Sequence, residues 1–188
     1  MSINVNTLAP PPTVSAQIVT ASNGNLQQAF TRHVVHDGTT LGYKNHVRAF
    51  GEIYVFGNTT STPIATVNTN YQFTQGVYIV NPLTVNFDAS GNGLRYLGES
   101  GVFFVHANLN AVSGATGQQC SFYLARNGTI FNNTKCSQSV DTSRGQNGIC
   151  SGVMSLTTND IVTLLMANNS AANSITITDL SFEVFALN

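Results

Sequence analysis

From about residue 49 onward the chain consists of short apolar runs separated by turn-forming residues, and this pattern restricts it to a fold built from sheets. The stretch 102–110 shows the pattern most clearly. One of its faces carries Phe103, Val105, Ala107 and Leu109, and the other begins with Phe104 and continues with His106, Asn108 and Asn110. Successive side chains of a strand point to opposite faces, so this stretch predicts a strand with one buried face. Many short strands of this kind are typical of a β-sandwich or barrel.

The same criteria predict further strands along the chain. They lie near residues 51–56, 62–66, 77–80, 84–87, 101–109, 121–126, 128–131, 149–156, 161–167 and 174–187. Four Asn-Gly pairs occur, at 23–24, 92–93, 127–128 and 147–148. This pair tolerates positive φ and favours tight turns, so each is expected at a turn. The clearest hairpin is predicted at Asn127-Gly128.

The last predicted strand changes phase along its length. Ile175 and Ile177 have one parity, whereas Leu180, Phe182, Val184 and Ala186 have the other. A β-bulge near Asp179 adds one residue and would bring both sets to the same face. Alternatively, the second face of this strand is buried against a neighbouring subunit through Phe185 and Leu187.

The first 48 residues read differently from the rest. Pro10, Pro11 and Pro12 favour an extended polyproline conformation, which indicates an arm rather than a core. Within it Leu26, Phe30 and Val34 recur every four residues before Gly38 and predict a short helix, although a strand at 33–36 fits nearly as well. We therefore expect an N-terminal arm at 1–48 and one folded domain at 49–188.

Charged residues make up only 8% of the chain, against roughly 25% in ordinary soluble domains, and the net charge is -1. The charges are scattered singly, so no basic stripe is available to follow nucleic-acid phosphates. Weak self-repulsion favours association between copies, although a neutral secreted domain would share this composition. No apolar run is long enough to insert in a membrane, and the N-terminus lacks the features of a secretory signal, which predicts synthesis and assembly inside a cell.

Enzymatic chemistry finds little support. The motifs GxSxG, HExxH, GxxxxGK[ST] and GxGxxG are absent from the sequence, and there is no Trp to form a sugar platform. We therefore predict no catalytic residues and no cofactor. The closest approach to a metal motif is His33 and His36 with Asp37 and His46, and solvated arm residues are the preferred interpretation because a strand would separate the first two. No metal site is predicted, and His106 is interpreted as a satisfied interface histidine.

The three cysteines are Cys120, Cys136 and Cys150. Cys136 and Cys150 flank a polar segment that a disulfide between them would close. The odd number and the missing export signal favour free thiols instead.

Three segments carry a family resemblance: GLRYLGESGVFFVHANL at 93–109, SFYLARNGT at 121–129 and TNDIVTL at 158–164. Together they resemble structural proteins of phages and large DNA viruses whose heads are jelly rolls of the tumour-necrosis-factor and complement-head type. The resemblance runs from about residue 51 to the end. It implies an all-β fold, a jelly-roll sandwich (tumour-necrosis-factor-like) with an extended N-terminal arm, assembled as a homotrimer.

The resemblance also implies a function, that of a non-enzymatic protein of the virion: a minor capsid, decoration or fibre-head component. The arm, with Pro10, Pro11, Pro12 and Phe30, would anchor the chain to other virion structural proteins. The candidates for packing in the core or at the trimer interface are Tyr54, Phe56, Phe104, Tyr123, Phe182 and Phe185. The alternative is a receptor-binding or lectin-like module that recognises a host glycan or protein through loops such as 132–148.

Overall fold

The structure, a computed structural model, describes residues 32–36, 41–45, 48–74, 78–143 and 145–187. The chain divides into two compact units, Met1–Val47 and Arg48–Asn188. In the first unit, β1 (Arg32–His36) pairs antiparallel with β2 (Leu41–Asn45). Val34 therefore lies in a strand and not in the helix that its spacing predicted. Pro10, Pro11, Pro12 and Phe30 lie outside the described residues, so the anchoring arm stays a prediction.

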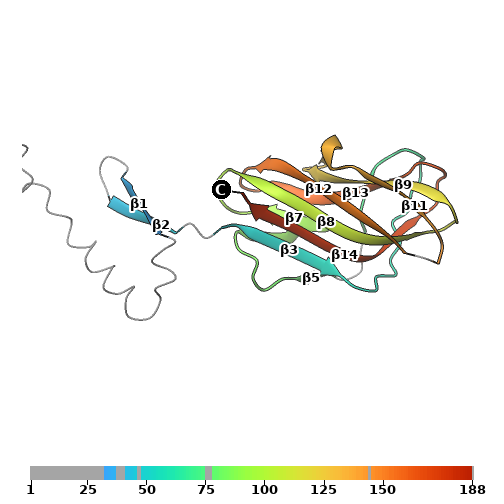
Figure 1. The fold of residues 1–188 in the computed structure, drawn as a ribbon, viewed down its shortest axis with the longest axis horizontal. Coiled ribbons are helices and arrows are strands. Elements are labelled where there is room, and N and C mark those ends of the chain that lie inside the picture. Colours follow the sequence, from blue (N-terminus) through green and yellow to red (C-terminus); the bar gives the residue numbers. More distant parts are fainter. Residues whose placement is uncertain (1–31, 37–40, 46–47, 75–77, 144, 188) are drawn as a thin grey trace, which may run out of the picture. The chain divides into compact units, whose positions relative to one another are not determined.

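The second unit is a sandwich of two antiparallel sheets (Figure 1). The five-stranded sheet has the order β12-β8-β14-β3-β5, with β12 (Gln146–Leu156), β8 (Gly101–Ser113), β14 (Ile175–Ala186), β3 (Phe50–Val55) and β5 (Ile79–Val80). The seven-stranded sheet has the order β10-β9-β13-β7-β6, with β10 (Thr129–Ile130), β9 (Gln118–Arg126), β13 (Ile161–Asn168), β7 (Gly93–Tyr96) and β6 (Phe87–Ser90). It is completed by β11 (Cys136–Val140), which pairs with β9, and by β4 (Tyr71–Gln72), which pairs with β13. A 3-10 turn, η2 (Asn132–Thr134), precedes β11. No helix in the described part of the chain is long and apolar enough to cross a membrane.

The core lies between the two sheets and is formed by the alternate side chains that face inward. Phe103 and Phe182 enter it from the five-stranded sheet, and Phe122 and Leu164 from the seven-stranded sheet, all nearly free of solvent exposure. Near one end, the rings of Phe87, Tyr96 and Phe103 form a cluster with centroids 4.7 to 5.8 Å apart. Burying these faces supplies the main driving force for closing the sandwich.

A β-bulge interrupts the pairing of β14 with β8. Ile177 pairs with Ala111 and Asp179 pairs with Asn110, so β14 has one extra residue between them. The predicted bulge near Asp179 is confirmed. It turns Leu180 and the residues of its parity toward the core, on the same side as Ile177.

The hairpin predicted at Asn127-Gly128 is also confirmed. Both residues have positive φ, of 50° and 77°, and Arg126 pairs with Thr129 across the turn. This two-residue loop matches the twist of its strands because both central positions are left-handed.

The other two described Asn-Gly pairs differ from this hairpin: one lies one residue beyond the centre of its turn, and the other lies within a strand. The turn between β6 and β7 uses Gly91 and Asn92, with φ of 56° and 59°, and Gly93 begins β7. A Cβ at Gly93 would lie 2.3 Å from the carbonyl oxygen of Val162, so this glycine permits close strand approach. Asn147 and Gly148 lie within β12, paired with β8, so the turn predicted there was wrong. Asn23-Gly24 lies outside the described residues.

Most predicted strands occur within a few residues of their expected bounds, but some do not. The segment predicted at 62–66 is not a strand, and Thr62 forms only an isolated bridge with Ile175. The strand predicted at 84–87 is β6, which begins at Phe87. The strands β2, β4, β7 and β11 were not predicted. The last of these, CSQSV, is largely polar because its side chains at 137 and 139 are exposed, so apolar periodicity gives little signal.

Candidate functional site

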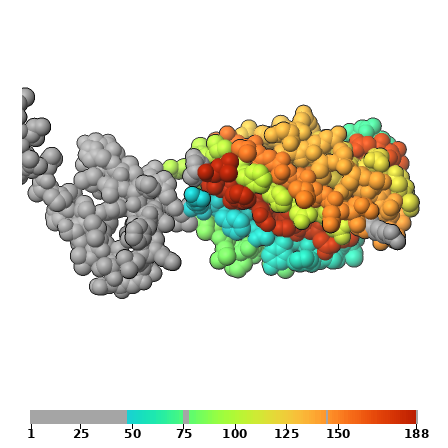
Figure 2. Space-filling view, viewed as in Figure 1, coloured from blue at the N-terminus to red at the C-terminus, as the bar shows by residue number. Residues whose placement is uncertain are grey.

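Most of the exposed large apolar side chains in the described residues belong to or adjoin the five-stranded sheet. Its solvent-facing side, called here the outer sheet face, carries Val102 of β8 and Ile149 and Val153 of β12, which are 40%, 60% and 48% exposed. The described strands of the seven-stranded sheet contribute none to this set. Figure 2 shows part of this face, with β14 in red between β8 and β3. Apolar side chains exposed together on one sheet make this face a candidate contact surface.

Two phenylalanines form the apolar end of the outer sheet face. Phe104 of β8 is paired with Phe185 of β14, and their ring centroids lie 5.2 Å apart at 42°. Val153 is paired with Phe104 on its other side, and Leu187 follows directly after β14. Because both rings are only half-buried, a partner would still remove apolar area from water here.

A row of polar side chains crosses the face beyond this end. His106 of β8 is paired with Glu183 of β14, which is paired in turn with Glu52 of β3. The ring of His106 is stacked with that of Phe104 at 6.3 Å and 15°. The row separates the apolar end from the rest of the face.

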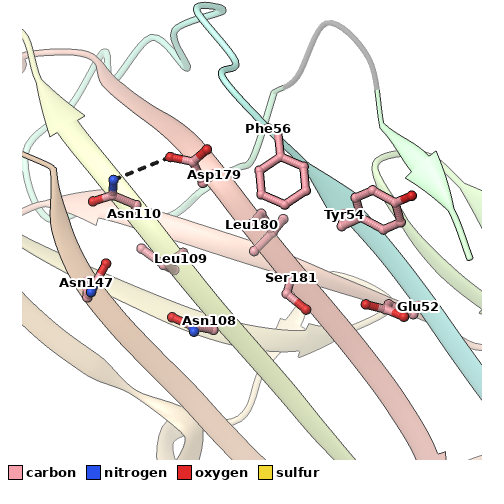
Figure 3. Close-up of a pocket in the computed structure, with 10 residues that line it drawn as sticks. All are labelled: Glu52, Tyr54, Phe56, Asn108, Leu109, Asn110, Asn147, Asp179, Leu180 and Ser181. Atoms are coloured by element: carbon pink, nitrogen blue, oxygen red, sulfur yellow. Dashed lines mark hydrogen bonds between the residues drawn. The ribbon is translucent and has the colours of Figure 1, made fainter.

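A groove of about 510 Å³ lies on the far side of that row (Figure 3). Tyr54 and Phe56 stand on one side of it, with ring centroids 5.8 Å apart, and Asn147 lies on the opposite side. Asn108 and Ser181 lie between them. The groove combines exposed aromatic rings with amide and hydroxyl groups.

Asp179, at the bulge, organises the end of this groove. Its carboxylate accepts hydrogen bonds from the Gly57 backbone N–H at 3.1 Å, the Thr178 hydroxyl at 2.9 Å and the Asn110 side-chain amide at 3.4 Å. The bond from Gly57 lowers the pKa of Asp179 most, burial opposes it, and Thr178 and Asn110 lower it further. The ionised form is therefore favoured, and it ties the segment after β3 to the bulge.

Replacing Asp179 by alanine is expected to lower the free energy of unfolding by about 1–2 kcal/mol at pH 7, because several donors lose their acceptor. Since the folded pKa lies below the ordinary value of 3.8, this stabilisation is present above that value and is lost as the pH falls through the folded pKa. Urea unfolding of both proteins at pH 7 and pH 3 measures the difference. A gap of equal size at both pH values would contradict this role.

The structure brings together four of the six packing candidates. Tyr54, Phe56, Phe104 and Phe185 lie on or beside the outer sheet face. Phe182 lies instead in the core, and Tyr123 lies on the seven-stranded sheet with the Lys135 ammonium 5.7 Å from its ring centroid.

The candidate set did not include Val102, Ile149 or Val153. The signal was present for β12, where Ile149 and Val153 alternate with Cys150 and Met154, so both faces of this strand are apolar. Such a strand needs cover on its second face as well as its first.

The described side chains that could bind a metal ion do not gather at one place. Within the described ranges no three His, Cys, Asp or Glu side chains form a group able to hold a metal ion. His33 and His36 belong to β1, whereas Asp37 and His46 lie outside the described residues. The three cysteines are present as free thiols.

Known proteins resemble this chain in fold and not in sequence. No family model matches the chain, and no curated protein matches it in sequence. Among solved structures, the phage PRD1 vertex protein P5 is similar over 84% of this chain and 83% of that one, with a TM-score of 0.52 and 12% identity. Murine APRIL covers 73% of this chain at a TM-score of 0.49 and 13% identity, with 99% of its own chain matched. The tumour necrosis factor Eiger of S. frugiperda is similar over 75% of this chain and 93% of its own chain. The TM-score is 0.49 and the sequence identity is 14%.

The chain is therefore an all-β jelly-roll sandwich, as predicted. The PRD1 vertex protein P5, the neighbour above with a TM-score over 0.5, agrees with the jelly-roll fold that the sequence resemblance implied.

Proposed function

We propose that the chain is a non-enzymatic structural protein of a virus particle that acts as a homotrimer through its outer sheet face. One observation carries the proposal: one sheet leaves Val102, Ile149 and Val153 exposed beside the half-buried rings of Phe104 and Phe185, whereas the described strands of the other sheet hold no exposed large apolar side chain. Such one-sided exposure suits a face covered by further copies.

The charge distribution favours another copy of this chain as the partner that covers the outer sheet face. The chain has a net charge of -1 and only 8% charged residues, so copies repel each other weakly. The apolar end of the face carries no lysine or arginine in β3, β8, β12 or β14. A strongly charged partner would find little complementary charge there. Three-fold symmetry follows the sequence resemblance.

The virion role rests on the sequence resemblance and is supported by the similarity to the PRD1 vertex protein. In this role residues 1–48 form the arm that anchors the jelly roll to neighbouring virion proteins. Pro10, Pro11 and Pro12 in this segment favour an extended backbone, which suits binding along the surface of a neighbouring protein.

The native mass of the purified full-length chain tests the oligomer. A mass three times the 20.0 kDa of one chain is expected at micromolar concentration, by native mass spectrometry and by sedimentation. A 20.0 kDa species alone would overturn the proposal. For the virion role, peptides of this chain should be recovered from purified particles, and their absence from every particle fraction would exclude it.

Receptor or glycan binding is the second candidate function. The segment 132–148, first considered as a recognition loop, is largely occupied by η2, β11 and the start of β12. The groove offers a better surface, because Tyr54 and Phe56 can stack on an apolar ligand face while the amides of Asn108 and Asn147 form hydrogen bonds. Saturable binding to a glycan array that is lost in Phe56→Ala would favour this function.

A further inference from the structure

Two cysteines that belong to different sheets meet at one edge of the sandwich. Cys136 is the first residue of β11 in the seven-stranded sheet, and Cys150 lies in β12 of the five-stranded sheet, paired with Ala107. Their Sγ atoms are 2.8 Å apart. This separation exceeds a disulfide bond of ~2.05 Å by only about 0.8 Å.

The surrounding sequence explains why the two strands approach so closely. Cys150 is preceded and followed on the same side of β12 by glycines, Gly148 and Gly152. A Cβ at Gly148 would lie 2.9 Å from the Gln138 side chain and 3.3 Å from the Cys136 sulfur. A Cβ at Gly152 would lie 2.6 Å from the Thr134 methyl group. The two glycines therefore leave room for the segment 134–138 to pack against β12 and bring the sulfurs together.

We propose that Cys136 and Cys150 form an intramolecular disulfide that joins the two sheets of the sandwich once the protein meets an oxidant. The bond would close a loop of the 15 residues from 136 to 150. This inference does not depend on the proposed function, because it uses only contacts within one chain.

The two thiols have different roles in forming the bond. Cys136 is partly exposed, and its hydrogen bond with the thiol of Cys150 lowers the pKa of Cys136. Cys150 is fully buried, and its hydrogen bond to Cys136 together with burial raises its pKa. Cys136 is therefore the nucleophile and Cys150 the resolving thiol.

With glutathione disulfide as oxidant, the Cys136 thiolate attacks one sulfur of the glutathione pair and breaks its S–S bond. This step gives a mixed disulfide and one glutathione thiolate, which takes up a proton. Cys150 loses its proton and attacks the Cys136 sulfur, and a second glutathione leaves as its thiol. Two electrons and two protons pass from the cysteine pair to glutathione disulfide, which becomes two glutathione molecules.

Cys120 supplies an internal control. It lies in the core of the same chain with no exposure to solvent, and burial raises its pKa to about 11. Its thiol should therefore react slowly with glutathione disulfide and stay reduced while the protein is folded.

The experiment treats the full-length chain with glutathione disulfide or with dithiothreitol, then alkylates under denaturing conditions. After oxidation, peptide mapping should show a 136–150 cross-link in at least about nine-tenths of the chains, because structural disulfides resist reduction by glutathione. Cys120 should be alkylated. The oxidised protein should have a Tm higher by roughly 6–12 °C than the reduced one, from the entropy of closing a 15-residue loop.

The matched variants Cys136→Ser and Cys120→Ser separate this pair from general thiol effects. Cys136→Ser should show no redox-dependent change of Tm, whereas Cys120→Ser should keep the full change. Three alkylated cysteines after oxidation, a cross-link involving Cys120, or disulfides only between chains would each overturn the proposal. Should Cys136→Ser fail to fold, peptide mapping of the unmodified chain still decides the question.

Discussion

Phe104→Asp is expected to convert the proposed trimer to monomers, with an association at least roughly 100-fold weaker. Central aromatic residues of an interface commonly contribute 2 kcal/mol or more, which corresponds to this factor. The substitution places a carboxylate beside Phe185, whose ring centroid lies 5.2 Å from that of Phe104, in a region that the trimer would remove from water. Sedimentation over a range of protein concentrations measures the change.

Tyr123→Asp is the matched control for this experiment. Tyr123 is also a half-buried aromatic residue in the middle of a strand, but it belongs to β9 of the other sheet, and Lys135 lies next to its ring. This variant should remain trimeric. A trimer that survives Phe104→Asp and dissociates with Tyr123→Asp would move the interface to the seven-stranded sheet. Circular dichroism of both variants establishes that the monomer remains folded.

Phe182→Ala is expected to lower the free energy of unfolding by about 3–5 kcal/mol. Phe182 is 1% exposed in the core and lies on β14 between Ile53 of β3 and Ala107 of β8. Truncation to alanine removes most of this buried ring and leaves a cavity that the strands on both sides cannot readily fill. Urea unfolding at one fixed protein concentration measures the loss, because oligomerisation makes stability depend on concentration.

Leu83→Ala provides the exposed comparison for this core substitution. Leu83 is 72% exposed and lies between β5 and β6. Its removal should change the free energy of unfolding by no more than about 0.5 kcal/mol. An equal loss of unfolding free energy in the two variants would show that Phe182 is not part of the core.

Local chemistry was enough to predict most of the strands and their special positions. The turn at Asn127-Gly128 depends on two adjacent residues that accept positive φ, so it is visible in the sequence. The bulge at Asp179 was visible for a related reason. A change of parity between Ile177 and Leu180 can be reconciled with one buried face only by an added residue.

The Asn-Gly dipeptide alone does not distinguish the two uses of glycine after asparagine. Gly128 allows a left-handed turn, whereas Gly93 and Gly148 allow another chain segment to approach closely. Both uses produce the same dipeptide. Only the positions of Val162 and Gln138, distant in sequence, distinguish them.

What the amino-acid sequence determined by itself is therefore the alternation of its strands, their turns and the bulge, since these depend on neighbours along the chain. The tertiary structure alone decided which apolar side chains on the second faces of the strands lie together: Phe104 of β8 adjoins Phe185 of β14 and Val153 of β12, whereas Phe182 is buried between the sheets. It also brought Cys136 to Cys150 and formed the groove beside Phe56. The physical reason is that burial depends on which sheet packs against which, and that pairing is made by residues far apart in the chain.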